Sequence, residues 1–478
     1  MADTSCCKLH AIIFPLPYQG HINPFVNLAI KLASKGLTVT FVHAEHIHHT
    51  LTKSNTDKET DLFSAVRKSG LDIRYSTITD GFPVEFDRLL HLDEYWRSLL
   101  NDFPARVDEF IGNMIGSADS TPVSVLIADS FFAWSPGIAR KYDLVNVSFF
   151  TQPALVFTVG FHWDIVTQNG HFPVKGNNEE EIKYVPGVDS ISTKDLMSYF
   201  KEEEIETVVH KAVFAAFHEM SKADFVLHYT VQELESKTLD TLSKNQPTYA
   251  IGPVYSFTNR PETTRVAKSL RSESDCAKWL DSKPPGSVLY VSFGSVVQTS
   301  KHVIQEIAYG LLLSEVNFLW VAREDILKSG DSDIFPDGFQ DEIKGKGLIV
   351  PWCDQIMVLS NRGVGGFVTH CGWNSTLESM WCGVPMICNP VAYDQPTNRK
   401  LVVEDLKIGI NLSDGEPIRR EEVAEKIRGF MSGSASQGLR DQAEKVKKIL
   451  HYASDNGGSS ERNLDKFIED LRAKIIHL

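Results

Sequence analysis

The stretch "GFVTHCGWNSTLES", residues 366–379, is typical of a β-strand that runs through a short turn directly into an α-helix. The apolar strand ends at His370, and Asn374, Ser375 and Glu378 stand where the helix begins. Helix N-termini carry unpaired backbone N–H groups and favour negative charge. The stretch therefore predicts a strand–turn–helix unit that holds a polar, anionic ligand at its turn.

A purely structural interpretation of the same residues is also open. Asn374 or Ser375 could be an ordinary N-cap, and Glu378, three positions after Ser375, would complete a capping box. Capping does not explain His370, nor Gly372, whose missing side chain lets the backbone approach a ligand closely.

Short apolar runs rich in Val and Ile alternate with helix-length segments on both sides of this unit. Continuous apolar strands separated by helices are typical of parallel sheets that are covered on both faces. The pattern therefore predicts the α/β class. The predicted strands are 9–15, 37–43, 123–129, 145–150, 287–295, 316–322, 366–370 and 384–388.

Chain length and a break in this pattern predict two domains. The 478 residues exceed what one hydrophobic core usually holds, about 250–300 residues. Residues 252–285 combine several prolines with many Ser, Thr and charged residues, which is typical of a linker. We therefore expect two Rossmann-like, doubly wound parallel-sheet domains, 1–251 and 286–456, that face each other across a cleft. Ligands of such sheets bind outside the carboxyl ends of the strands.

The final segment, residues 457–478, is predicted to be an amphipathic helix that follows a flexible break at Gly457 and Gly458. A helix with one apolar stripe must bury that stripe against another part of the protein. The C-terminal domain or the N-terminal domain could cover it, and the pattern alone leaves this open. The stripe consists of Leu464, Phe467, Ile468 and Leu471.

Composition narrows the possible partners. The formal net charge of −14 argues against binding to nucleic acid or to an anionic membrane surface. Seven cysteines without a CxxC pair or metal-ligand spacing favour a reducing compartment, and we expect the cytoplasm. The most apolar long stretch, residues 144–163, is interrupted by polar residues and proline, so no stable membrane insertion is expected. We expect a monomer.

A candidate catalytic pair lies in the N-terminal half. His21 follows the first predicted strand, and Asn23-Pro24 is predicted to open the next helix, so His21 would stand at the rim of the cleft. A histidine has an ordinary pKa of about 6.5 and can accept a proton from a hydroxyl group at neutral pH. Asp129 ends the strand 123–129 and could orient the imidazole of His21. The alternative is that Asp129 caps the following helix, a task for which Ser130 also competes.

At this point the sequence resembles a known family. The run "WCDQ…THCGWNSTLES…CGVP…DQ", between residues 352 and 395, closely resembles the signature box of plant family-1 UDP-glycosyltransferases. The stretches "PLPYQGHINP" (15–24) and "GGSSERNLDKF" (457–467) resemble the end motifs of the same family. The resemblance implies the GT-B fold and a last helix that returns to the N-terminal domain. It also implies that His21 is the general base and Asp129 its partner.

The resemblance further implies how a UDP-sugar would be held. The aromatic face of Trp352 would stack on uracil, whose edge would bond the Cys353 backbone and the Gln355 side chain. Glu378 would hold the ribose hydroxyls. The residues that would face the diphosphate are Ser295, His370, Gly372 with its turn, Asn374 and Ser375.

A third set of residues resembles the groups that face the donor sugar. The set consists of Trp373, Asp394, Gln395 and Thr151. Gln395 at the last position favours glucose over galactose in the family. One residue departs from the family pattern, since Asp354 stands where proline is usual. This departure puts the local loop geometry in question.

Together these features predict an inverting, metal-independent glucosyltransferase that uses UDP-glucose and no cofactor. The acceptor would be a hydroxyl group of a lipophilic small molecule, of phenolic, flavonoid or terpenoid type, and the product a β-glucoside. Another UDP-sugar, or a C-, N- or S-linkage, stays open. A nicotinamide-dependent oxidoreductase would need GxGxxG after the first strand, which is absent. A non-catalytic nucleotide-sugar binder would be expected to lack His21 or Asp129.

Two further stretches resemble metal-binding sites. "HAEHIHH" (43–49) holds four histidines and is predicted to be an exposed loop, because no cysteine or aspartate at ligand spacing accompanies it. "DSD" (331–333) resembles the acidic pair of metal-dependent transferases, but it is predicted to be a surface loop because no strand leads into it.

Overall fold

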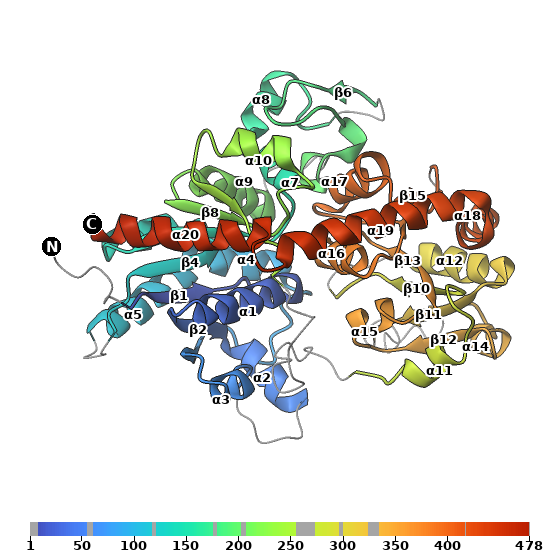
Figure 1. The fold of residues 1–478 in the computed structure, drawn as a ribbon, viewed down its shortest axis with the longest axis horizontal. Helices are drawn as coiled ribbons and strands as arrows, with labels where there is room; N and C mark the ends of the chain where they lie inside the picture. The colour runs from blue at the N-terminus through green and yellow to red at the C-terminus, as the bar shows by residue number, and fades with distance from the viewer. Residues whose placement is uncertain are drawn as a thin grey trace.

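Two parallel sheets organise the chain, one in each half of the sequence (Figure 1). The computed structural model describes residues 8–54, 61–116, 121–174, 179–201, 207–254, 273–295, 300–323, 334–415 and 417–477. Helices lie on both sides of each sheet, so the expected doubly wound α/β arrangement is confirmed. We call the two halves the N-terminal unit and the C-terminal unit.

The N-terminal sheet has seven strands in the order β3-β2-β1-β4-β5-β8-β9, all parallel. Its strands are β1 His10–Phe14, β2 Thr38–Ala44, β3 Ile73–Ile78, β4 Val125–Asp129, β5 Val145–Phe150, β8 Phe225–His228 and β9 Thr248–Ala250. The helices of this unit are α1 Gln19–Ser34, α2 Glu45–Ser54, α3 Ser64–Lys68, α4 Leu92–Asn101, α5 Phe103–Gly116, α6 Ser135–Lys141, α7 Ala154–Phe161, α8 Trp163–Gln168, α9 Val208–Met220 and α10 Ser236–Leu242. A small antiparallel pair, β6 Glu181–Ile182 and β7 Ile191–Ser192, is followed by the 3-10 turns η1 Thr193–Asp195 and η2 Ser198–Phe200.

The C-terminal sheet has six parallel strands in the order β12-β11-β10-β13-β14-β15. They are β10 Val288–Ser292, β11 Asn317–Val321, β12 Gly347–Val350, β13 Val364–Thr369, β14 Met386–Cys388 and β15 Gly409–Asn411. The helices are α11 Ala277–Asp281, α12 Lys301–Ser314, α14 Phe339–Glu342, α15 Gln355–Leu359, α16 Trp373–Cys382, α17 Gln395–Lys400, the π-helical turn η4 Leu401–Asp405, α18 Arg420–Ser432, α19 Ser434–Ser454 and α20 Ser459–Ile476.

In the two parallel sheets the sequence pattern identified eight strands and missed five, and it also missed the short pair β6 and β7. β3, β9, β12 and β15 lie at the edges of their sheets, where one side of the strand has no neighbour. Edge strands bury less surface and need fewer apolar residues, and β9 and β15 are only three residues long. β8 is the remaining missed strand of the two sheets, and its four residues, FVLH, give too short an apolar run to stand out.

The last helix, α20, lies against the N-terminal unit (Figure 1). The Phe467 ring packs edge-on against Phe225 of β8 and Tyr249 of β9, with centroid distances of 5.6 and 5.7 Å. The Tyr249 hydroxyl donates to Asp470 Oδ2 at 2.6 Å. On the neighbouring α1, Lys35 pairs with Asp465 at 2.6 Å. The two units are therefore linked by the chain at α20 as well as through residues 252–285.

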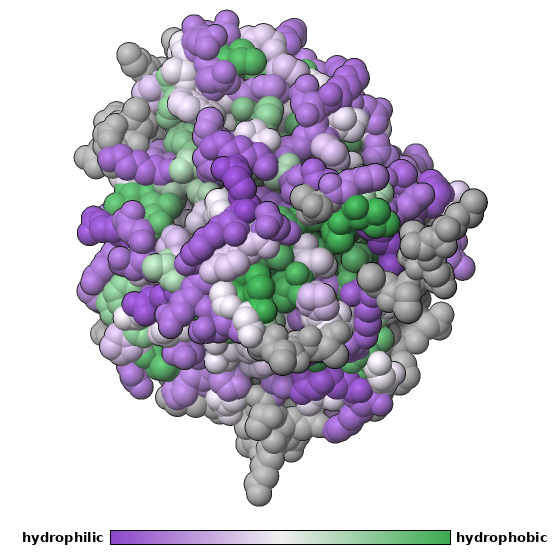
Figure 2. All heavy atoms as spheres, turned by 90° about the vertical axis from the view of Figure 1, so that its left-hand side faces the viewer, coloured by the Kyte–Doolittle hydropathy of each residue, from purple (hydrophilic) through white to green (hydrophobic). Residues whose placement is uncertain are grey.

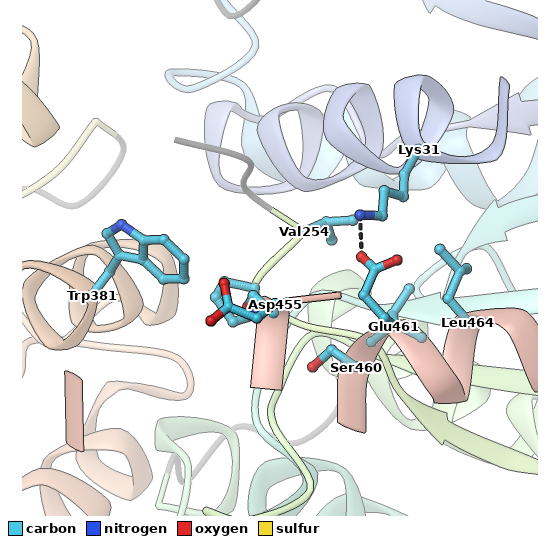
Figure 3. A pocket seen from close by; sticks show the side chains of 10 residues that line it. Lys31, Val254, Trp381, Asp455, Ser460, Glu461 and Leu464 are labelled. Carbon is cyan, nitrogen blue, oxygen red and sulfur yellow. Dashed lines mark ion pairs between the residues drawn. The ribbon is translucent and has the colours of Figure 1, made fainter. Parts of the chain in front are cut away.

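A cavity of about 40 Å³ lies beside this return crossing, between α1, α16, the start of α20 and residues 251–254. Figure 3 shows Lys31 of α1 reaching Glu461 of α20, with which it forms an ion pair, and Trp381 of α16 on the opposite side. A space of this size admits a water molecule or two. The end of the molecule formed by the N-terminal unit is mainly hydrophilic, with separate apolar patches (Figure 2).

The histidine-rich stretch 43–49 is not an exposed loop, so that prediction was wrong. β2 continues to Ala44 and α2 begins directly at Glu45, because the helix packs back on the sheet without a connecting loop. His43 is buried, and His46 Nδ1 lies 3.0 Å from Asp80 Oδ2. Residues 331–333 lie outside the described residues.

No helix in the described ranges is both long and apolar enough to cross a membrane.

Candidate active site

Three polar side chains meet at the carboxyl edge of the N-terminal sheet. Asp129 is the last residue of β4, Thr151 follows β5, and His21 lies in the first turn of α1, just after β1. These strands are neighbours in the parallel sheet, so their carboxyl ends share one edge. His21 Nδ1 lies 2.7 Å from Asp129 Oδ2 and 3.1 Å from Thr151 Oγ1.

Asp129 is held in place from two sides. Its carboxylate accepts the backbone N–H of Leu16 at 3.4 Å and that of Phe131 at 3.1 Å, and the residue is 1% exposed. It does not cap the following helix, since α6 begins at Ser135 with Trp134 as N-cap. The capping alternative for Asp129 is therefore wrong. A buried carboxylate at Nδ1 orients the ring and leaves Nε2 as the basic nitrogen.

The start of α1 differs from the prediction. The helix begins at Gln19 and not at Asn23-Pro24, so His21 is part of the helix and Pro24 lies inside it. The first turn closes early because the backbone N–H groups of His21 and Ile22 both donate to the carbonyl of Tyr18, at 2.8 and 2.9 Å. Asn23 does not act as an N-cap, because Gln19 Nε2 donates to its side-chain oxygen at 2.8 Å.

Across from this edge, α16 begins without a side-chain cap. Its N-cap is Gly372, and the capping interpretation of residues 374–378 is wrong. Ser375 Oγ and Glu378 Oε2 both accept from Gln355 Nε2 instead, at 2.9 and 2.6 Å. The Tyr290 hydroxyl donates to Gln355 Oε1 at 3.2 Å. Three residues that the family pattern assigns to the nucleotide are thus gathered into one hydrogen-bonded group.

His370 follows β13 and is packed between two glycines. A Cβ atom at Gly294 or at Gly372 would come within 2.5 Å of His370 Nε2, so both positions require glycine. Burial lowers the pKa of His370 to about 4, which makes the imidazole neutral at pH 7. Ser295, three residues after β10, is half-buried beside Gly294. The sequence pattern did not lead us to Gly294. A glycine that stands between the end of a strand and the candidate residue Ser295 could have indicated a close contact at this position.

The loop between β12 and α15 contains the departure from the family pattern. Asp354 is the N-cap of α15, and its carboxylate accepts the backbone N–H of Met357 at 2.9 Å. Its φ of −68° is the value that proline would impose, so the backbone at this position suits either residue. Cys353 is buried, and the carbonyl of Trp352 accepts the N–H of Ser274 at 2.9 Å.

The residues that resemble the sugar-facing set are all buried, and most have partners within the protein. Asp394 Oδ2 accepts from Asn398 Nδ2 at 2.7 Å, and Gln395 Oε1 accepts the N–H groups of Val391 and Ala392. Burial raises the pKa of Asp394 to about 6. The imidazole of His21, in the other unit, opposes this rise in the pKa of Asp394.

The units are joined by hydrogen bonds that sequence reasoning missed. Trp373 Nε1 donates to the carbonyl of Tyr229 at 2.6 Å, and Asn374 Nδ2 donates to the carbonyl of Gly20. These partners lie 144 and 354 positions apart in the chain. No spacing rule reaches over such separations, so the sequence held no signal for them.

A second set of contacts joins η1 and η2 of the N-terminal unit to α17. Arg399 forms a buried ion pair with Asp195, and Thr397 Oγ1 donates to the carbonyl of the same residue at 2.6 Å. Ser198 and Tyr393 exchange two hydrogen bonds, at 2.9 and 2.8 Å. The edge that carries His21 and the start of α16 are therefore held face to face.

Within the described part of the chain, no group of three or more His, Cys, Asp or Glu residues is arranged to hold a metal ion.

Comparisons with known proteins agree with this architecture. The family described as "UDP-glucoronosyl and UDP-glucosyl transferase" matches residues 264–412, and "Glycosyltransferase, N-terminal domain" matches residues 8–256. The chain is 49% identical to UDP-glycosyltransferase 86A1 of Arabidopsis thaliana, over 98% of this chain and 95% of that protein.

Two solved structures share the whole fold. Os79 from O. sativa, solved in complex with UDP, has a TM-score of 0.81 and 26% identity, covering 97% of this chain and 100% of that chain. UGT2 of Phytolacca americana, complexed with UDP-2fluoro-glucose and pterostilbene, has a TM-score of 0.77 and 25% identity, covering 97% and 99%. With the two-sheet fold, the His21–Asp129 pair and these matches in view, the chain belongs to the plant family-1 UDP-glycosyltransferases, and it is a glycosyltransferase of the GT-B fold.

Proposed function

We propose that this enzyme transfers glucose from UDP-glucose to a hydroxyl group of a lipophilic small molecule and inverts the anomeric configuration. The observation that carries the proposal is the contact of His21 with the buried carboxylate of Asp129, at the sheet edge that faces α16. A base on one unit and a nucleotide site on the other would allow attack from the side opposite to UDP.

His21 would act through Nε2, since Nδ1 is engaged with Asp129 and Thr151. Nε2 accepts the proton of the acceptor hydroxyl while the oxygen of that hydroxyl attacks the anomeric carbon of the sugar. The bond from this carbon to the UDP oxygen breaks at the same time. The Asp129 carboxylate stabilises the imidazolium that forms. Attack on an α-linked donor from the opposite face gives a β-glucoside.

The leaving UDP would be stabilised by the N-terminus of α16 and by His370. A helix N-terminus presents several backbone N–H groups and a partial positive charge to a phosphate. His370 is neutral, so its part is to donate a hydrogen bond to a phosphate oxygen and not to supply a charge. On this basis we propose that the reaction needs no metal ion and no cofactor.

The acceptor would meet an aromatic environment close to the base. The ring of Phe131 lies edge-on to that of His21 at 5.8 Å, and Tyr18, the N-cap of α1, stacks on Trp96 at 6.5 Å. Apolar and aromatic linings suit phenolic, flavonoid or terpenoid aglycones. The acceptor pterostilbene in the UGT2 complex is of the phenolic type.

Glucose is the proposed donor because the related structure named above holds UDP-2fluoro-glucose and because this chain ends its signature box on Gln395. All proposed site residues come from one chain, so a monomer suffices for activity. The described cysteines are free, which suits the cytoplasm as the proposed location.

The test is a panel of phenolic, flavonoid and terpenoid acceptors incubated with UDP-glucose, UDP-galactose or UDP-glucuronic acid and analysed by mass spectrometry. We expect hexose addition with UDP-glucose, and a large coupling constant of the anomeric proton in the NMR spectrum of the product, as a β-glucoside requires. The His21→Ala variant should bind UDP normally but lose on the order of 100- to 10,000-fold in kcat. An α-linked product, or full activity of this variant, would overturn the mechanism.

A further inference from the structure

Pro24 leaves one backbone carbonyl of α1 without its usual donor. In a regular helix the N–H of residue 24 would donate to the carbonyl of residue 20, but proline has no N–H, and its ring pushes that carbonyl away from the helix axis. Proline is ordinarily tolerated in the first turn of a helix. Pro24 is the sixth residue of α1 and lies beyond that turn. The carbonyl that Pro24 leaves open belongs to Gly20, directly beside His21.

The donor that reaches this carbonyl comes from the other unit. Asn374, the second residue of α16, donates from Nδ2 to the Gly20 oxygen. A Cβ atom at position 20 would lie 3.4 Å from this Nδ2, an ordinary van der Waals distance, so the two residues are in close contact. The other amide atom of Asn374, Oδ1, is buried and has no partner among the described residues.

The neighbouring residue fixes the same turn of α16. Trp373 Nε1 donates to the carbonyl of Tyr229, which follows β8 in the N-terminal unit. Two consecutive residues of the first turn of α16 therefore bind backbone carbonyls of the N-terminal unit. A contact made at two adjacent points resists rotation, which a single hydrogen bond does not.

We propose that Pro24 and Asn374 together position the base. Pro24 leaves the carbonyl of Gly20 without a donor inside the helix, and Asn374 donates a hydrogen bond to that carbonyl. The start of α16, the proposed donor-binding helix, therefore fixes the position of His21. Asn374 acts here on His21 through Gly20, as a positioning residue. The inference rests on the proposed function in that it takes His21 to be the general base. It gives the proline of the stretch "QGHINP" a physical role that helix formation alone does not provide.

The device has a direct consequence for the reaction. A base must stand within hydrogen-bond reach of the acceptor hydroxyl, and small displacements of catalytic groups cost much of the rate. Asn374 belongs to the turn that meets the diphosphate by resemblance to the family, and it also holds the residue before the base. Binding of the donor to that turn would therefore affect the position of His21 through one side chain, that of Asn374.

Pro24→Ala separates this role from simple packing. Alanine restores an N–H at position 24, which then donates to Gly20 within the helix and displaces Asn374. The variant should unfold at the same or a higher temperature, because an internal proline is the poorer helix former. We expect kcat to fall roughly 3- to 10-fold, as for the loss of one net hydrogen bond, while the Kd for UDP stays within about two-fold.

A double-mutant cycle with Asn374→Ala tests the link itself. Thermal and urea unfolding of the full chain would be measured for both single variants and for the double variant. If Asn374 bonds Gly20, its replacement costs less stability and less kcat when Pro24 is already alanine. Pro136→Ala is the matched control, because Pro136 stands in the first turn of α6, where no carbonyl is freed.

Additive effects of the two substitutions on stability, or a wild-type kcat in Pro24→Ala, would overturn the inference. The stability cycle does not depend on catalysis. If the enzyme shows no glucosyl transfer, or if His21→Ala remains active, the proposed function fails, whereas a missing coupling between Pro24 and Asn374 overturns only the positioning device.

Discussion

His21 Nδ1 and Asp129 Oδ2 lie 2.7 Å apart, although the two residues are 108 positions apart in the sequence. The contact exists because β1 and β4 are adjacent parallel strands whose ends meet at one edge of the sheet. Asp129 is almost fully buried, whereas the His21 side chain keeps 16% of its surface exposed. A buried carboxylate behind a partly exposed imidazole is the arrangement that a general base needs.

Asp129→Asn should remove most of the transfer activity without loss of folding. The amide keeps the size of the side chain, but it cannot stabilise the imidazolium and can favour the wrong tautomer of His21. We expect kcat to fall on the order of 100- to 10,000-fold, with UDP binding unchanged in calorimetry. Thr151→Val, which removes the other contact of Nδ1, should cost much less, and a variant Asp129→Asn with wild-type kcat would contradict the pairing.

Chelation should leave the activity intact. The proposed stabilisation of the leaving UDP relies on backbone N–H groups and a neutral imidazole, neither of which needs a cation. Initial rates would be compared with and without excess EDTA, after dialysis against a metal-free buffer. Loss of activity on chelation that magnesium or manganese restores would contradict this account and turn attention to residues 331–333.

Lowering the pH should destabilise the protein already at pH values well above those at which ordinary carboxylates titrate. Burial lowers the pKa of His43 and of His228 to about 3 and that of His370 to about 4, each from an ordinary value of 6.5. Between these values each of the three histidines binds a proton in the unfolded chain but not in the folded one, whereas Asp394, with its pKa raised to about 6, opposes them by one proton. The histidines outnumber Asp394, so stability rises with pH in this window and falls as pH drops below 6.5. Urea unfolding between pH 7 and pH 5 measures the effect.

His228 offers a quantitative check of the acid effect. It is fully buried beside the ring of Phe157, at a centroid distance of 4.8 Å. His228→Phe keeps an aromatic ring at this position but removes one proton taken up on unfolding. Near pH 5 the slope of unfolding free energy against pH should therefore drop by about 1.4 kcal/mol per pH unit relative to the wild type. An unchanged slope would show that His228 titrates normally.

Asp354→Pro and Asp354→Ala should differ in stability but not in UDP binding. Alanine removes the cap on Met357 N and should cost about 0.5–2 kcal/mol. Proline removes the same cap, but the φ of −68° suits its ring, and restriction of the unfolded chain returns about 0.4–1 kcal/mol. We expect Asp354→Pro to be the more stable of the two, with the Kd for UDP within about two-fold of the wild type in both.

Removal of the last helix should harm transfer more than UDP binding. A chain that ends at Gly458 exposes Phe225 and Tyr249, which Phe467 now covers, and it loses the pair of Lys35 with Asp465. Lower solubility and weaker transfer are expected, because the N-terminal unit carries the proposed base, His21. A milder variant, Phe467→Ala, should lower stability by about 3–5 kcal/mol. Tyr452→Ala is the control, since Tyr452 is 66% exposed. Full solubility and activity of the shortened chain would contradict this role of α20.

The sequence by itself determined the class of fold and identified most of the candidate site residues. Continuous apolar runs such as 123–129 and 145–150 can only be covered on both faces, which dictates parallel strands between helices. The rule that ligands bind at the ends of such strands was then enough to bring His21, Asp129 and Thr151 to one edge. Local patterns decide where each strand ends, and the order of β1, β4 and β5 in the sheet then brings together side chains that are far apart in the chain.

Only the tertiary structure decided which groups carry charge and how the two halves meet. His370 is neutral because burial removes it from water, and burial depends on Gly294 as well as on its neighbour Gly372. Asn374 looked like a helix cap and instead holds the carbonyl of Gly20, 354 positions away. Partners at such separations are set by the packing of the whole chain, since neither residue type nor spacing specifies them.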